Sequence, residues 1–377
     1  MDPNLGFPQL KSLIETVFRP GRGEKGLTIL TDLPDNRVRD TPEWRDRRNL
    51  CSEWYHALNS NRDALPFDQL SFYSYKNVGT NNNDLPPEVW RVEEGEEPGP
   101  TPIAVPLDAV LQQSSVIIAP TELSATAPLK LLAKRHLFRA ATLPGFARSM
   151  LPSLGLDYEK VHARVMQIKE RMDMAESILV RFAVPGSRYE MVFDTRFRAA
   201  HASGGLMREP GQVGNLPSGE AYIVPYEGET LGTPSLTSGC LPVQFDSEIV
   251  LYRIKDNKAW EINSIGARSM LELAKLREEP AYGNIAEVGI GVLGEWGVQA
   301  CGNILMDEKL GLHIAFGRSD HFGGSTSPAS FRNAHNVIHI DRVYVPSLQP
   351  RIKIEGVRFD YIGGENELIM ENGVLIV

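Results

Sequence analysis

The sequence predicts a protein of two parts: an α/β N-terminal domain with an open, mostly parallel sheet, and a mainly β (α+β) C-terminal domain that holds a metal site. The 377 residues exceed one ordinary hydrophobic core, and two domains are expected for that length. The first half alternates strand-like and helix-like runs, whereas the second half consists of short alternating runs rich in glycine.

In the first half, β-rich runs and helix-like runs follow one another. Residues 27–33 are the first predicted strand, and Thr41-Pro42-Glu43 then supplies an N-cap, a proline at the first helical position and an acidic first turn. Further strands are predicted at residues 70–75, 116–119 and 137–141, and a further helix through residues 129–136. This order favours parallel neighbours in one sheet. No strand-to-helix turn carries a glycine-rich phosphate-binding motif, so a nucleotide site has no support.

Residues 157–180 form the clearest helix pattern in the chain. Asp157 is a suitable N-cap, and apolar residues recur behind it at helical spacing. They are Val161, Val165, Ile168, Met172, Ala175 and Leu179. The pattern changes after Pro185-Gly186, so we expect an N-terminal domain of residues 1–184, which includes this helix, and a C-terminal catalytic domain of residues 185–377.

Composition and charge narrow the functional classes. Hydrophobic residues make up 42% of the chain and charged residues 23%, which is typical of soluble globular proteins. A net charge of −9 argues against nucleic acid as the main partner. The sequence contains no secretion signal and no apolar run long enough to cross a membrane, and its three cysteines are widely separated and odd in number. We therefore expect a cytoplasmic protein with reduced thiols and no membrane partner.

Four of the eight histidines crowd into one stretch near the C-terminus: His313, His321, His335 and His339. Asp341 follows the last of them at the second position, on the same face of a strand. Imidazole nitrogen and carboxylate oxygen are the usual donors to Zn²⁺, Mn²⁺, Co²⁺ and Fe²⁺. The stretch therefore indicates a metal centre.

Four strand-like runs in the second half share one pattern, with an apolar face opposite a face that carries an acid or an imidazole. They are residues 220–224 with Glu220, 285–291 with Glu287, 312–317 with His313, and 338–341 with His339 and Asp341. Buried carboxylates are costly alone but are satisfied when several converge on a divalent cation. Small residues beside Glu287 and His313 predict room for a substrate and for water.

The same four runs carry a resemblance to a known family. Asn215-Leu216-Pro217-Ser218-Gly219-Glu220, Ala286-Glu287-Val288, His313-Ile314-Ala315-Phe316-Gly317 and His339-Ile340-Asp341 match in order, spacing and context the thermophilic-type metallo-aminopeptidases, the family of aminopeptidase T and aminopeptidase S. The likeness extends from the long helix to the C-terminus, and the N-terminal half agrees only in its α/β pattern.

The resemblance implies a homodimeric enzyme that removes N-terminal residues from peptides with two divalent ions, Zn, Co or Mn. By that resemblance the metal ligands are Glu220, Glu287, His313, His339 and Asp341. A metal-activated water attacks the peptide bond in such a centre, and a carboxylate nearby moves the proton. Glu227 and Glu229 are candidates for that carboxylate, alongside the catalytic assignment of Glu220 and Glu287.

The chain departs from the family at one position. Family members carry a tyrosine shortly after the first ligand histidine, whereas this chain reads Arg318-Ser319-Asp320-His321-Phe322. Asp320 and His321 are the candidates to replace it as acid/base or as an extra ligand. His335 is expected to be exposed or to support a ligand.

Two other functions stay open at the level of sequence. Some relatives of this fold are Fe(II) dioxygenases that cleave hydroxypyridine rings, and His313, His339 and Asp341 could supply the two-histidine, one-carboxylate triad of such a site, acting on a small-molecule substrate. The two additional glutamates favour the dinuclear hydrolase. The third possibility is a peptide- or metal-binding protein without turnover.

Overall fold

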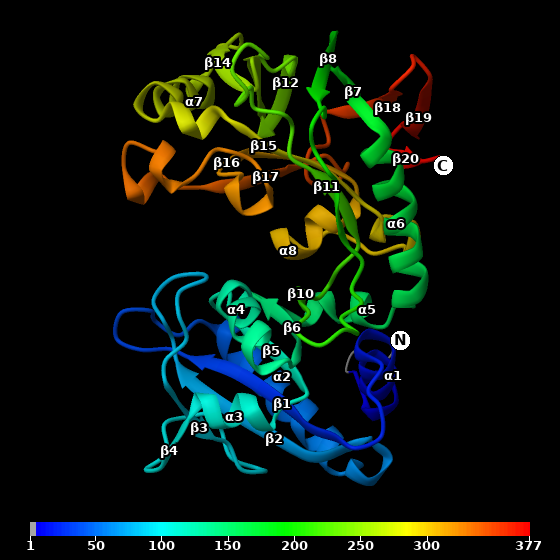
Figure 1. The fold of residues 1–377 in the computed structure, drawn as a ribbon. Helices are drawn as coiled ribbons and strands as arrows, with labels where there is room; N and C mark the ends of the chain where they lie inside the picture. Colours follow the sequence, from blue (N-terminus) through cyan, green and yellow to red (C-terminus); the bar gives the residue numbers. More distant parts are fainter. Residues whose placement is uncertain (1–4) are drawn as a thin grey trace. The chain divides into compact units, whose positions relative to one another are not determined.

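The protein has a mixed α/β architecture, described here by a computed structural model of residues 5–377 (Figure 1). Within those residues the chain forms eight α-helices and three sheets. It divides into two compact units: the first comprises the residues up to His162 together with Ser203–Ser218, and the second comprises Ala163–Ala202 and Gly219–Val377. The boundary predicted at residue 184 falls inside the second unit. The helices in the described part of the chain lack the combination of length and hydrophobicity that a membrane crossing requires.

A seven-stranded sheet forms the centre of the first unit. Its strands lie in the order β10 (Val213–Asn215), β6 (Arg139–Pro144), β5 (Val116–Thr121), β1 (Glu24–Leu33), β2 (Phe67–Lys76), β3 (Glu88–Arg91) and β4 (Ala104–Pro106). Neighbours from β10 to β2 are parallel, and β3 and β4 continue the sheet antiparallel. The expected open and mostly parallel sheet is therefore present.

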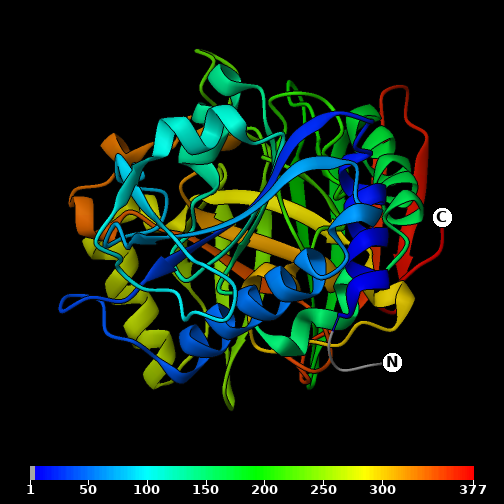
Figure 2. The same ribbon diagram turned by 90° about the horizontal axis from the view of Figure 1, so that it is seen from below.

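Helices cover both faces of this sheet (Figures 1 and 2). On one face, apolar residues of α3 and α4 share a buried cluster with strand residues such as Leu30 and Ile117. On the other face lies α2, whose N-cap Thr41 accepts a hydrogen bond from Trp44 N at 3.1 Å, as its sequence predicts. The helices are α1 (Phe7–Phe18), α2 (Pro42–Asn59), α3 (Leu107–Gln113), α4 (Thr126–His136) and α5 (Leu151–Leu154).

The predicted helix of residues 157–180 is too long. Helix α6 (Tyr158–Met174) ends at Met174, and the chain continues directly as strand β7 (Ala175–Val184). Ile178, Val180 and Phe182 are fully buried on alternate positions of this strand. Ala175 and Leu179 satisfy a helical period as well, but β-branched and aromatic residues that alternate inward favour a strand paired on both sides.

An antiparallel sheet of eight strands occupies part of the second unit, with α7 (Ala267–Glu278) packed against β13 and β14. Its strands lie in the order β14 (Lys258–Ile262), β13 (Glu248–Lys255), β12 (Ser238–Phe245), β8 (Ser187–Asp194), β7, β18 (Lys353–Tyr361), β19 (Asn366–Glu371) and β20 (Val374–Leu375). The mainly β texture expected for the second half is therefore observed.

A second sheet in this part of the chain carries all five predicted metal ligands. Its order is β17 (His339–Val343), β16 (Leu312–Gly317), β15 (Ile285–Gly291), β11 (Glu220–Ile223) and β9 (His201–Ser203). The register places Glu220 opposite Gly291, His313 opposite Gly289, and both Glu287 and Asp341 opposite Ala315. Because side chains directly opposite each other share a face, the five donors are presented on one side of this sheet. Helix α8 (Ile304–Asp307) precedes β16.

Candidate metal centre

The five predicted ligands form two groups that share one carboxylate. Donor atoms of Glu220, Glu287 and His313 lie within 4.8 Å of one another, and so do those of Glu287, His339 and Asp341. We call the first set the inner group, because its side chains are at most 8% exposed, and the second set the outer group, because His339 is 21% exposed. Glu287 belongs to both.

The glutamate at the centre faces one histidine on each side. His313 Nε2 lies 3.2 Å from Glu287 Oε1, and His339 Nε2 lies 3.4 Å from Glu287 Oε2. His313 Nε2 is also 3.4 Å from Glu220 Oε2, and His339 Nε2 is 3.7 Å from Asp341 Oδ1. One carboxylate oxygen of Glu287 therefore points into each group, so that each group has its own Glu287 oxygen as a donor.

Backbone carbonyls orient both histidines. His313 Nδ1 donates to Gly311 O at 3.3 Å, and His339 Nδ1 donates to Arg318 O at 2.8 Å. A carbonyl oxygen can only accept, so Nδ1 carries a proton in each ring, and Nε2 is the nitrogen that faces the carboxylates. Metal-binding histidines are held in this way by an outer hydrogen bond.

The small residues beside the donors make room for other protein atoms. The prediction that they leave room for a substrate is wrong. A Cβ on Gly289 would lie 2.1 Å from His313 Nε2, and one on Gly291 would lie 2.1 Å from the carbonyl carbon of Lys309. The glycines of β15 therefore allow the imidazole and the segment before β16 to lie directly on the strand.

The centre attracts positive charge. Burial opposes a charged imidazole, but the hydrogen bond to Glu287 and the charges of Glu220, Glu287 and Asp341 raise the pKa of His313 to about 9. Burial likewise opposes the charged form of Glu287, yet His313 and His339 hold the pKa of this carboxyl below its usual range. Glu220 Oε2 is buried and has no hydrogen-bond partner among the described residues. A buried carboxylate oxygen without a hydrogen-bond partner, 3.4 Å from Nε2 of the oriented His313, fits a divalent cation.

Lys309, which the sequence analysis did not identify, contacts the inner group. Its ammonium lies 2.7 Å from Glu220 Oε1 and also pairs with Glu308, and its side chain is 1% exposed. Burial and the carboxylate neighbours raise the pKa of Glu308 to about 8, whereas Glu220 and Glu308 keep Lys309 charged. A lysine next to a leucine in a short turn carries no motif, so only the fold reveals this contact.

The loop after β16 places His321 beside the outer group, and it places Asp320 3.6 Å from His321 Nδ1. The rings of His321 and His339 are 5.3 Å apart, centroid to centroid. Burial and the charges of His339 and Arg318 lower the pKa of His321 to about 4, so its imidazole is neutral near pH 7. Asp320 forms an ion pair with Arg318 and belongs to neither donor group.

An aromatic cluster adjoins His339 on this side. Phe322 packs edge-on against Tyr222 and His339, with centroid distances of 4.9 and 5.5 Å. His201 stacks on Tyr222 at 5.1 Å, and its Nε2 hydrogen-bonds with the carbonyl oxygen of Phe322 at 2.9 Å. His201 has no partner near it in sequence, so its place in the site could not be anticipated. His335 is exposed, which is one of the two environments expected for it.

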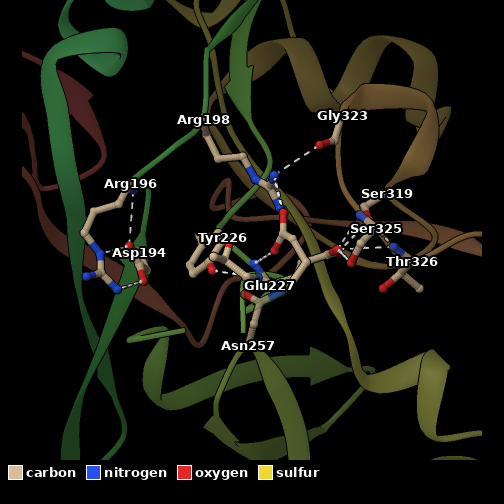
Figure 3. Close-up of polar contacts among 12 residues, drawn as sticks. Asp194, Arg196, Arg198, Tyr226, Glu227, Asn257, Ser319, Gly323, Ser325 and Thr326 are labelled. Carbon is tan, nitrogen blue, oxygen red and sulfur yellow. Dashed lines mark hydrogen bonds and ion pairs between the residues drawn. The ribbon is translucent and has the colours of Figure 1, made fainter. Parts of the chain in front are cut away.

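Glu227 anchors the His321 loop and is not a free base. Its carboxylate accepts hydrogen bonds from Asn284 Nδ2 at 2.7 Å, Ser319 Oγ at 2.5 Å, Ser325 N at 2.5 Å and Thr326 N at 3.2 Å. Figure 3 shows Ser319, Ser325 and Thr326 converging on it from one side. These bonds, opposed by burial, lower the pKa of Glu227. Its acceptor positions are filled, so it positions the loop instead of taking a proton from a substrate.

Glu229, the other candidate base, is also engaged. It pairs with Arg198 at 2.5 Å. Arg198 in turn donates to Gly323 O at 3.2 Å, as Figure 3 shows. The two glutamates thus hold the same loop from two points.

Replacing Glu227 with glutamine should loosen this loop. The new amide turns a donor toward either Asn284 Nδ2 or the backbone N–H groups of Ser325 and Thr326, which can only donate, so we expect the free energy of unfolding to fall by about 1–3 kcal/mol. Denaturant unfolding measures the loss, and limited proteolysis should detect new cleavage within residues 319–326. Glu229→Gln, which keeps the Glu227 hydrogen bonds, should cost less. Equal stability of Glu227→Gln and the wild type would contradict the assigned role.

Comparisons with known proteins identify structures of similar fold but no sequence family. No protein-family model and no curated protein matches the chain. The structure is similar to wild-type AmpT from Thermus thermophilus, with a TM-score of 0.53 and 14% identity over 98% of this chain and 99% of that one. It is also similar to 2,5-dihydroxypyridine dioxygenase from Pseudomonas putida, with a TM-score of 0.58 and 14% identity over 99% of this chain and 98% of that one. At this identity the likeness establishes a shared fold over nearly the whole chain.

Proposed function

We propose that the chain is a metal-dependent hydrolase that removes N-terminal residues from peptides with two divalent cations. The observation that carries this proposal is the central Glu287, whose two oxygens face His313 and His339 at 3.2 and 3.4 Å. A carboxylate placed between two donor groups suits a dinuclear centre. The similarity to AmpT and the resemblance of the four ligand motifs support the same reading.

The position of each residue determines the role that we assign to it. When bound, the two cations polarise the scissile carbonyl and make a water acidic enough to attack at neutral pH. Glu220 and His313 would hold the inner cation, His339 and Asp341 would hold the outer one, and Glu287 would donate to both. We assign to His321, neutral and partly exposed, a hydrogen bond with the substrate in place of the family tyrosine.

Incubation with short peptides tests the proposal. Protein loaded with Zn²⁺, Mn²⁺ or Co²⁺ should shorten unblocked peptides one residue at a time, read by mass spectrometry, and should leave the same peptides intact after N-acetylation. Absence of trimming with all three metals would refute the aminopeptidase assignment.

Replacing His321 with alanine should reduce turnover without removing metal. Loss of a positioned hydrogen-bonding or acid–base group typically costs at least about 100-fold, so we expect kcat/KM to fall roughly 100-fold. Metal content by elemental analysis should be unchanged, since His321 belongs to neither donor group. His335→Ala, an exposed histidine on the same segment, is the matched control and should behave as the wild type. A His321→Ala variant that loses metal would make His321 a ligand instead.

One observation favours ring cleavage as the second candidate. Phe322 and His321 place aromatic rings beside His339, and Tyr222 packs edge-on against Phe322, so a planar substrate could stack there. Against it, donor atoms of His313, His339 and Asp341 do not form a three-membered group within 4.8 Å in the described part of the chain. Oxygen consumption by Fe²⁺-loaded protein with a dihydroxypyridine distinguishes the two reactions.

A further inference from the structure

A lysine ammonium lies against the inner group. Lys309 follows α8 in a short turn, Glu308–Leu310, and its ammonium lies 2.7 Å from Glu220 Oε1. With 1% exposure, the side chain has no room to leave toward solvent. The proposed ligands other than the histidines are three carboxylates, and Lys309 neutralises one of them.

The fold fixes this lysine in place. A Cβ on Gly291 would come within 2.1 Å of the Lys309 carbonyl carbon, and one on Gly294 within 2.7 Å of Leu310 O, so the turn lies directly on the end of β15 and the residues after it. Asp307, just before the turn, accepts hydrogen bonds from Cys301 N and Gly302 N at 2.9 Å each. The ammonium is therefore a fixed part of the site.

The outer group differs from the inner group in this respect. Its donors Glu287, His339 and Asp341 face one another without a lysine or arginine paired to them, within the described residues. It is also the more exposed group, with His339 21% and Asp341 10% exposed. Accessible donors and uncompensated negative charge both favour entry of a cation there.

We propose that Lys309 makes the two donor groups unequal, so that the outer group binds a divalent cation first and the inner group binds a second cation more weakly, in competition with Lys309 for Glu220. Only Glu220 Oε2, buried and without a hydrogen-bond partner among the described residues, is left for the inner cation. This inference rests on the proposed dinuclear centre and assigns the order in which it fills.

Calorimetric titration of Mn²⁺ into chelator-stripped protein tests the order of binding. The wild type should bind two equivalents, the second at least ~10-fold more weakly than the first, because a fixed positive charge repels a cation held by the same carboxylate. Lys309→Met should tighten the second step by ~10-fold or more, and Lys309→Arg, which keeps the charge, should not. Lys275→Met, which removes a half-exposed lysine paired to Glu272, is the matched control and should leave both steps unchanged.

Two ligand variants keep the inference testable if Lys309→Met does not fold. Glu220→Gln should remove the weak step and spare the tight one, whereas Asp341→Asn should remove the tight step. Two equal steps in the wild type, or loss of the tight step in Glu220→Gln, would overturn the inference and leave the dinuclear hydrolase standing. Unequal steps in a protein that trims no peptide would support the inference and refute the aminopeptidase. Absence of Mn²⁺ binding would refute both.

Discussion

We expect Glu287→Gln to lose cations from both donor groups at once and to cut peptide cleavage by more than ~1,000-fold. The carboxylate is 6% exposed and is the one donor that the inner and outer groups share. Loss of a supporting hydrogen bond alone typically costs 10–100-fold in metal affinity, so removal of a shared ligand should cost at least ~100-fold at each site. Elemental analysis after gel filtration measures the loss directly.

The matched control for Glu287→Gln is Glu190→Gln. Glu190 pairs with Arg181 on the surface of the second unit, with a side chain 60% exposed, and should keep its metal and activity. Circular dichroism should show both variants folded. Retention of two ions by folded Glu287→Gln would show that this residue is not the bridge.

We expect Gly289→Ala to displace His313 and to reduce activity by more than ~100-fold. The new Cβ would lie 2.1 Å from His313 Nε2, far inside van der Waals contact, and the ring is held on its other side by Gly311 O. Overpacking of this kind costs about 1–3 kcal/mol of stability. The same shift moves Nε2 away from Glu220 and Glu287, so the inner cation should be lost while the outer one remains.

Gly21→Ala provides the control for this substitution. Gly21 is exposed, and a Cβ there meets nothing within 4 Å. Unfolding curves and Mn²⁺ stoichiometry should both match the wild type. If Gly289→Ala bound two ions with unchanged affinity, the close packing of His313 on β15 would have no role in the centre.

The sequence could predict the metal-site face because a strand repeats every two residues. Glu287, His313 and Asp341 each alternate with apolar neighbours, and the register of β15, β16 and β17 then brings them to one face. The parallel sheet could be predicted because strand-like and helix-like runs alternate in the first half. The N-cap Thr41 marks where one of these helices begins.

Features that depend on distant contacts could not be predicted. Lys309 meets Glu220 across a long stretch of sequence, and Glu227 meets Ser319 in the same way. Residues 175–180 fit a helical period, but they form a strand because β7 pairs with β8 and β18. The glycines of β15 make room for His313 and for the Lys309 backbone and not for a substrate. The sequence does not show which neighbour fills the space beside a glycine.

The central claim is that five side chains bind two cations through a shared Glu287, and an anomalous difference map from crystals grown with Mn²⁺ tests it most directly. We predict two peaks roughly 3.5–4 Å apart. One should lie between Glu220 and His313, the other between His339 and Asp341, each touching one oxygen of Glu287. A single peak bound jointly by His313, His339 and Asp341, or no peak at these residues, would contradict the account.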